Sequence, residues 1–304
     1  MPIETNVEVV PTIHDHAQLL LGAVLFFACT FLVAFRNHFF TLPYAREIAP
    51  GRRLHVLEVL GVFATFLSGM LIVSPLIAYI WISIQTGMWN DPAQQKLDEV
   101  TQSWVNLLGI AISSLAVFSY CMLLGSSARQ TVWGARAWKG WLSAFSDIKI
   151  GMLTWFVCYP LVIVISQSIA IIISWFGFVI TRNEQVAVKF LRMAMEHPVL
   201  LTLTAIFIVV VVPVVEEVLF RGFLQTWIKQ LWGRSVAIVI ASLTFALFHF
   251  APSQGFDNVE LITSLFVLAC FLGFVYERQR SLWASIALHG TFNLVSVLAI
   301  LLGA

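Results

Sequence analysis

Two adjacent carboxylates and an arginine lie inside a stretch of the chain that is otherwise almost wholly apolar. Glu216, Glu217 and Arg221 fall between Leu200 and Leu224, among valine, leucine, isoleucine and phenylalanine residues. A carboxylate at bilayer depth costs several kcal/mol unless it is paired, protonated or facing a water-filled cavity. The three charged residues therefore indicate a functional site.

The spacing of these charges assigns them different partners. Glu217 and Arg221 are four residues apart, so on a helix they share a face and can form an ion pair. Glu216 points about 100° away because the helix repeats every 3.6 residues, which leaves it free for another neighbour. Pro213 lacks a backbone N–H, so we expect it to free the carbonyl of Val209 and to kink the helix near the site.

Three further polar residues in the last third of the chain complete the set. His249 ends a later apolar segment, and His289 and Asn293 are one helical turn apart in the last one. Glu216 and His249 are equally far from a turn at Trp232-Gly233, so an antiparallel helical hairpin brings them to one height. The helix that carries His289 and Asn293 can then close the third side of the site.

Together these groups have the composition of a hydrolytic site. A carboxylate can take a proton from water, an imidazole can orient that water, and histidine and asparagine donors can hold an oxyanion. A single histidine on a membrane helix is more often a packing or hydrogen-bonding group, but polar groups on three helices indicate a site. The remaining histidines lie outside the apolar spans and are expected to be solvated or interfacial: His14, His16, His38, His55 and His197.

The composition is that of a membrane protein with many spans. The chain has 304 residues, of which 60% are hydrophobic and 11% charged, and its mean hydropathy is +0.90. Its net charge is +1 and it has no basic tract, which argues against nucleic acid as a partner. The four cysteines lie within apolar segments, where a free thiol behaves as a small hydrophobe.

Eight apolar stretches are candidates for spans of about 20 residues, which predicts an all-α bundle of about eight transmembrane helices. They run approximately over Ala17 to Phe35, Leu57 to Ile84, Trp104 to Leu124, Ile150 to Ile180, Val199 to Phe220, Ser235 to Phe250, Leu261 to Tyr276 and Leu282 to Leu302. The sixth and seventh are short. We expect residues 1–195 to form an N-terminal membrane region of about four helices, and residues 196–304 a catalytic four-helix core.

The segment Ser127 to Asp147, rich in tryptophan and cations, is predicted to be an interfacial amphipathic stretch.

The distribution of cations predicts the orientation of the protein in the membrane. With the N-terminus outside, thirteen of the 17 lysines and arginines fall on the cytoplasmic side, and four outside, namely Lys96, Arg182, Lys189 and Arg192. The excess of cytoplasmic cations favours both termini outside.

The order of the motifs resembles that of a known family. Glu216-Glu217-x-x-x-Arg221-Gly222, then Phe245-x-x-x-His249, then His289-x-x-x-Asn293, is similar to the three motifs of the CPBP family. These are the CAAX proteases and bacteriocin-processing enzymes, also called the ABI family. The stretch from Arg182 to Val199 also resembles the segment before the first motif in bacterial members, so we expect a multi-pass protein of the bacterial plasma membrane.

The resemblance implies an intramembrane endopeptidase. In it, Glu216 and His249 would activate the attacking water, and His289 and Asn293 would stabilise the oxyanion, with Glu217 and Arg221 as a structural pair. The substrate would be a membrane-associated protein or peptide, lipidated in eukaryotic members, whereas bacterial relatives have been assigned peptide maturation or self-immunity.

Family members are often described as metalloproteases. The sequence contains no HExxH motif, and zinc as an alternative cofactor would be held by Glu216, His249 and His289. A metal-free mechanism without a cofactor is favoured, because Asn293 suits an oxyanion donor better than a zinc ligand.

Two other classes of function stay open. A transporter or proton relay would use intramembrane Glu and His to move ions, but such proteins usually have two pseudo-symmetric halves with broken helices in both. The first four predicted spans of this chain lack buried charge. A non-catalytic membrane scaffold or immunity-type protein would keep the fold but has no need for Glu216.

Overall fold

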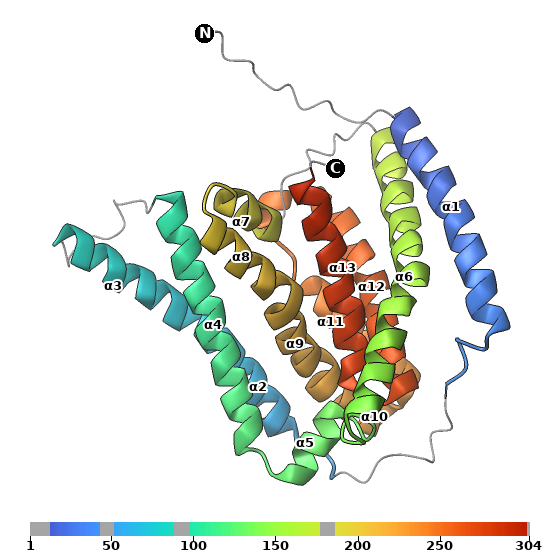
Figure 1. Ribbon diagram of the computed structural model, residues 1–304, viewed down its shortest axis with the longest axis horizontal. Coiled ribbons are helices and arrows are strands. Elements are labelled where there is room, and N and C mark those ends of the chain that lie inside the picture. Colours follow the sequence, from blue (N-terminus) through green and yellow to red (C-terminus); the bar gives the residue numbers. More distant parts are fainter. Residues whose placement is uncertain (1–12, 43–51, 88–97, 177–185, 303–304) are drawn as a thin grey trace.

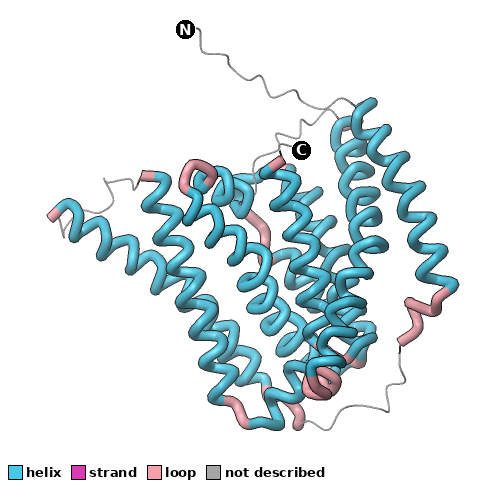
Figure 2. Tube along the Cα trace, viewed as in Figure 1, coloured by secondary structure: helices cyan, strands magenta, loops and turns pink. Residues whose placement is uncertain are grey.

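A computed structural model describes residues 13–42, 52–87, 98–176 and 186–302. These residues form helices and short connections, with no strand among them (Figures 1 and 2). Seven helical segments within them are long and apolar enough to cross a membrane. The predicted all-α membrane bundle is therefore confirmed.

The long helical segments run alternately up and down (Figure 1), and two of them consist of two or three consecutive helices. In chain order they are α1 (Ile13–Arg36), α2 (Val56–Ser68), α3 (Ser74–Thr86), α4 (Glu99–Leu123), α5 (Ser126–Trp133), α6 (Trp141–Trp175), α7 (Val186–Ala194), α8 (Pro198–Ile206), α9 (Val212–Glu217), α10 (Thr226–Trp232), α11 (Arg234–Leu247), α12 (Asp257–Gln279) and α13 (Leu282–Leu301). A 3₁₀ turn, η5 (Pro252–Gln254), precedes α12.

Each of the eight predicted apolar segments contains a helix, but the helix in the sixth is shorter than the hydrocarbon core is thick. Helix α11 has 14 residues, which at 1.5 Å per residue gives about 21 Å against a hydrocarbon core of about 30 Å. The seventh segment, expected to be short, is the 23-residue helix α12. The end of the fourth prediction, residues 177–180, lies outside the described residues.

Wide π turns interrupt two of the long helical segments. Turn η1 (Gly69–Val73) joins α2 to α3, and turns η3 (Phe207–Val211) and η4 (Val218–Gln225) flank α9. Helix α9 is only six residues long and ends with the two adjacent glutamates. Because π turns change the rotation of the residues that follow, they alter which neighbours these carboxylates meet.

The predicted interfacial stretch Ser127 to Asp147 consists of α5, a turn and the start of α6. The side chains of Trp138 and Trp141 are exposed, as expected for residues at a membrane interface. Trp133 instead packs against Trp283 of α13, with ring centroids 5.3 Å apart. Its role includes packing within the protein.

Buried polar groups also occur outside the expected region. The side chain of Asp147 is fully buried and pairs with Arg136 at 2.8 Å. His16 is buried as well, and its Nδ1 lies 2.7 Å from Oε1 of Gln167. The expectation that His16 is solvated is therefore wrong, because α1 packs against α6 and places the imidazole between the two helices.

One hydrophobic core joins the N-terminal and C-terminal parts of the chain. It contains Val62 of α2, Val117 of α4, Val132 of α5 and Phe220 of η4, together with residues of α11, α12 and α13. The division into two regions at residue 195 stays a prediction, and the packing of this core crosses it.

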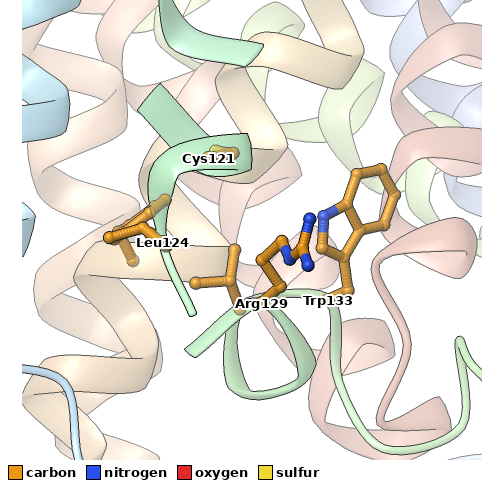
Figure 3. Close-up of a pocket in the computed structure, with 6 residues that line it drawn as sticks. Cys121, Leu124, Arg129 and Trp133 are labelled. Atoms are coloured by element: carbon orange, nitrogen blue, oxygen red, sulfur yellow. The ribbon is translucent and has the colours of Figure 1, made fainter. Parts of the chain in front are cut away.

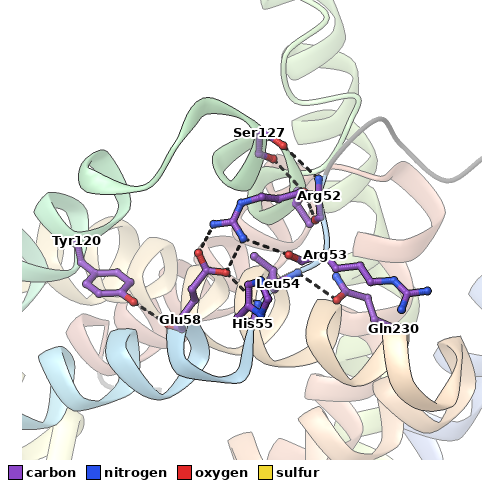
Figure 4. Close-up of polar contacts among 9 residues, drawn as sticks. Arg52, Arg53, Leu54, His55, Glu58, Tyr120, Ser127 and Gln230 are labelled. Carbon is purple, nitrogen blue, oxygen red and sulfur yellow. Dashed lines mark hydrogen bonds and ion pairs between the residues drawn. The ribbon is translucent and has the colours of Figure 1, made fainter.

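A polar cluster fixes the start of α2 to the C-terminal region (Figure 4). The backbone N–H of Leu54 donates to Oε1 of Gln230 at 3.1 Å, and Thr131 of α5 donates to the carbonyl of Arg52 at 3.1 Å. Arg52 also pairs with Glu58 in the first turn of α2. These contacts hold α2, α5 and α10 together at one end of the bundle.

Candidate functional site

The predicted ion pair lies at the centre of the site. Arg221 Nη1 is 3.1 Å from Glu217 Oε1, and both side chains are fully buried. The second terminal nitrogen of Arg221 donates to the carbonyl of Ala269 on α12 at 3.2 Å. The guanidinium also lies over the ring of Phe245, 4.6 Å from its centroid. The arginine thus fixes α9 and η4 against α11 and α12.

Glu217 has a second partner that sequence reasoning did not foresee. Nδ1 of His289 lies 3.0 Å from the Oε1 atom of Glu217 that also pairs with Arg221. Since a carboxylate paired with arginine is an acceptor, His289 donates through Nδ1–H. Its other nitrogen, Nε2, is then directed towards Glu216. No spacing in the sequence signals this contact, because α9 and α13 are far apart along the chain.

The structure brings Glu216 and both histidines together. Nε2 of His249 is 3.9 Å from Glu216 Oε1, and Nε2 of His289 is 3.7 Å from Glu216 Oε2. The hairpin of α10 and α11 places Glu216 and His249 opposite one another, as the equal distances from the turn predicted. The side chain of His249 is 34% exposed and that of His289 only 6%, so the cluster is open on the His249 side.

His249 is oriented by the main chain at the end of α11. The helix ends at Leu247, and His249 lies in the turn that follows. Its Nδ1 is 2.9 Å from the carbonyl oxygen of Phe245, which can only accept, so Nδ1 carries the hydrogen. In the neutral imidazole the lone pair is then on Nε2, the nitrogen that faces Glu216. The separation of 3.9 Å is too long for a direct hydrogen bond.

The ring of Phe245 lies between the two histidines and the arginine. Its centroid is 4.8 Å from that of His249 and 5.8 Å from that of His289. Phe245 is fully buried. Phe245 shares a sequence motif with His249, and its ring packs against both imidazoles.

Asn293 bonds to the main chain rather than to a side chain of the predicted set. Its Nδ2 donates to the carbonyl of Ile208, in turn η3, at 2.8 Å. The sequence led us to expect that Pro213 frees the carbonyl of Val209, one residue further on, and this stays a prediction. In turn η3 the N–H of Val212 reaches back five residues to Phe207.

Glu216, His249 and His289 offer donors of types that zinc accepts. Among the described residues, however, no group of three His, Cys, Asp or Glu side chains is arranged as a metal site.

A small pocket lies away from the polar cluster. It is lined by Cys121, Leu124, Arg129, Val132, Trp133 and Phe223, from α4, α5 and η4 (Figure 3). None of the predicted catalytic or ion-pair residues lines it.

The fold and the cluster define an integral multi-pass membrane protein with paired carboxylates and histidines buried among its C-terminal helices. Residues 198–295 match the sequence model of a family described as type II CAAX prenyl endopeptidase Rce1-like. This part of the chain is similar to that family, which is the CPBP family that the motifs resemble. No curated protein and no solved structure was found to be similar to the chain.

Proposed function

We propose that this protein is an intramembrane endopeptidase that hydrolyses a peptide bond of a membrane-associated protein or peptide. The Rce1-like family match supports a peptidase, and the observation that carries the mechanism is the gap between Glu216 and His249. Oε1 and Nε2 are both acceptors, 3.9 Å apart. One water molecule beside the two atoms can donate a hydrogen to each.

The proposed reaction uses these two groups on the water. Its oxygen attacks the carbonyl carbon of the scissile peptide bond while a proton passes to Glu216. The carbonyl π electrons move onto oxygen and form a tetrahedral oxyanion. When the oxyanion collapses, the C–N bond breaks and the leaving nitrogen takes the proton from Glu216. This cycle restores the carboxylate without a metal or another cofactor.

His289 and Asn293 are proposed to stabilise the oxyanion. The protonated form of His289 has a second N–H at Nε2, while its Nδ1–H is held by Glu217. Asn293 has two amide hydrogens, only one of which is needed for Ile208. Arg221 holds Glu217 in place and takes no part in proton transfer.

The substrate class is also proposed from the family. The family description names CAAX prenyl endopeptidases, so a lipidated peptide anchored in the membrane is the first substrate to test. We place the protein in the bacterial plasma membrane, because its segment before the first motif resembles that of bacterial members.

Cleavage of a panel of membrane-anchored and prenylated peptides in lipid nanodiscs tests this function. Glu216→Gln keeps the shape of the side chain but cannot accept the proton, so cleavage should fall by about 10²- to 10⁴-fold. Glu260→Gln, which alters a carboxylate on α12 outside the cluster, is the matched control and should cleave normally. Full cleavage by Glu216→Gln would exclude the mechanism.

A further inference from the structure

A proline and a π turn together leave one main-chain carbonyl near the site without a helical donor. In an α-helix the carbonyl of Ile208 would accept from the N–H of Val212. Here that N–H bonds to Phe207 instead, five residues back. The π register would then pair Ile208 with residue 213, which is proline and has no N–H. The carbonyl of Ile208 therefore receives neither an α-helical nor a π-helical hydrogen bond.

Asn293 supplies the missing donor from α13. Its amide nitrogen lies 2.8 Å from the Ile208 oxygen. The two segments approach closely because Gly290, one turn earlier on α13, has no side chain. A Cβ at Gly290 would lie 2.8 Å from the carbonyl oxygen of Val209, which is nearer than such atoms normally approach.

This contact fixes the direction of the Asn293 amide. A carbonyl can only accept, so the NH₂ group must face Ile208 and the Oδ1 atom must face away. With one N–H held, the second N–H has a defined direction. Without this partner the amide is free to rotate by 180°, which exchanges the positions of its oxygen and its nitrogen. An amide oxygen at the position of the nitrogen would repel an oxyanion.

We propose that Pro213 is a positioning residue for the site, acting through the Ile208 carbonyl on Asn293. The proline keeps that carbonyl available by removing the main-chain donor that would otherwise compete for it. The catalytic part of this inference rests on the proposed function, in which Asn293 stabilises the oxyanion. The positional part concerns the fold alone.

A double-variant cycle in activity tests the catalytic part. Pro213→Ala supplies the competing N–H and should lower the turnover number by roughly two- to tenfold at unchanged KM, the range for losing one neutral hydrogen bond. In the Asn293→Ala background the same change should have no further effect. Equal losses in both backgrounds, or no loss in the parent, would overturn the proposal.

Two further variants guard against a merely structural effect. Pro160→Ala removes the proline inside α6 and should leave the turnover number unchanged. Gly290→Ala forces α13 away from η3 and should reproduce the loss of turnover caused by Pro213→Ala, without altering the proline. If Gly290→Ala keeps full turnover, the contact does not position the amide.

Thermal unfolding of the purified protein tests the positional part without any activity. Asn293→Ala leaves the Ile208 carbonyl unpaired and should lower the unfolding midpoint by a few degrees. In the Pro213→Ala background this loss should be smaller, because the new N–H can pair with the carbonyl. If the effects of the two substitutions on the midpoint depend on each other but the protein cleaves no peptide, the proposed function is rejected and the contact is retained. If the two effects are independent, the contact itself is rejected.

Discussion

A single oxygen atom of Glu217, Oε1, accepts two hydrogen bonds, from Nδ1 of His289 at 3.0 Å and from Arg221 at 3.1 Å. The carboxylate pairs with the buried cation and also sets which imidazole nitrogen carries hydrogen. Glu217 is therefore a positioning residue for His289 as well as half of an ion pair. Glu216, one residue earlier, is left to face the two Nε2 atoms.

The ion pair leads to a prediction about folding. Arg221→Met leaves Glu217 buried without its cation, which should cost about 3–5 kcal/mol and reduce the yield of monodisperse protein in detergent. Adding Glu217→Gln removes the unpaired charge and should restore part of that yield. Lys189→Met, at an exposed position on α7, is the control and should fold normally. A double variant no better folded than Arg221→Met would show that the charges do not stabilise each other.

The proposed oxyanion donor leads to a kinetic prediction. Asn293→Ala should lower the turnover number by roughly 10²- to 10³-fold, the usual effect of removing one such donor, while KM stays close to the parent value. Steady-state cleavage of a fluorogenic membrane-anchored peptide would separate the two constants. A variant that changes KM alone would place Asn293 in substrate binding.

Metal analysis separates the two mechanisms that the residues allow. We expect active purified protein to contain no stoichiometric zinc and to keep its activity after treatment with a chelator. Elemental analysis and cleavage should be measured on the same sample. One zinc per chain, lost together with activity, would replace the metal-free mechanism by one in which Glu216, His249 and His289 bind the ion.

The positions of the two chain ends lead to a prediction about the orientation in the membrane. The N-terminal end of α1 and the C-terminal end of α13 lie at the same end of the bundle (Figure 1). Reporter fusions at Met1 and Ala304 should therefore read as non-cytoplasmic, and an insertion between Arg46 and Arg53 as cytoplasmic. Arg46 lies outside the described residues. A cytoplasmic reading at Ala304 would contradict the predicted orientation.

The sequence by itself determined the class of protein and much of the candidate site. Its apolar stretches of about 20 residues predict membrane helices, because a helix satisfies its backbone hydrogen bonds within one segment. The four-residue spacing of Glu217 and Arg221 fixed their pairing, since that contact lies within one helix. The meeting of Glu216 with His249 followed from equal distances to a turn.

Only the tertiary structure decided the contacts between helices that are far apart in sequence. Whether His289 reaches Glu217, or Asn293 reaches Ile208, depends on the rotation of α13 against α9 and η3. The π turns change that rotation, and no residue pattern predicted these turns. The burial of His16 was missed because it depends on the packing of α1 against α6. Local spacing specifies contacts within a helix, whereas packing between helices depends on the register of both partners.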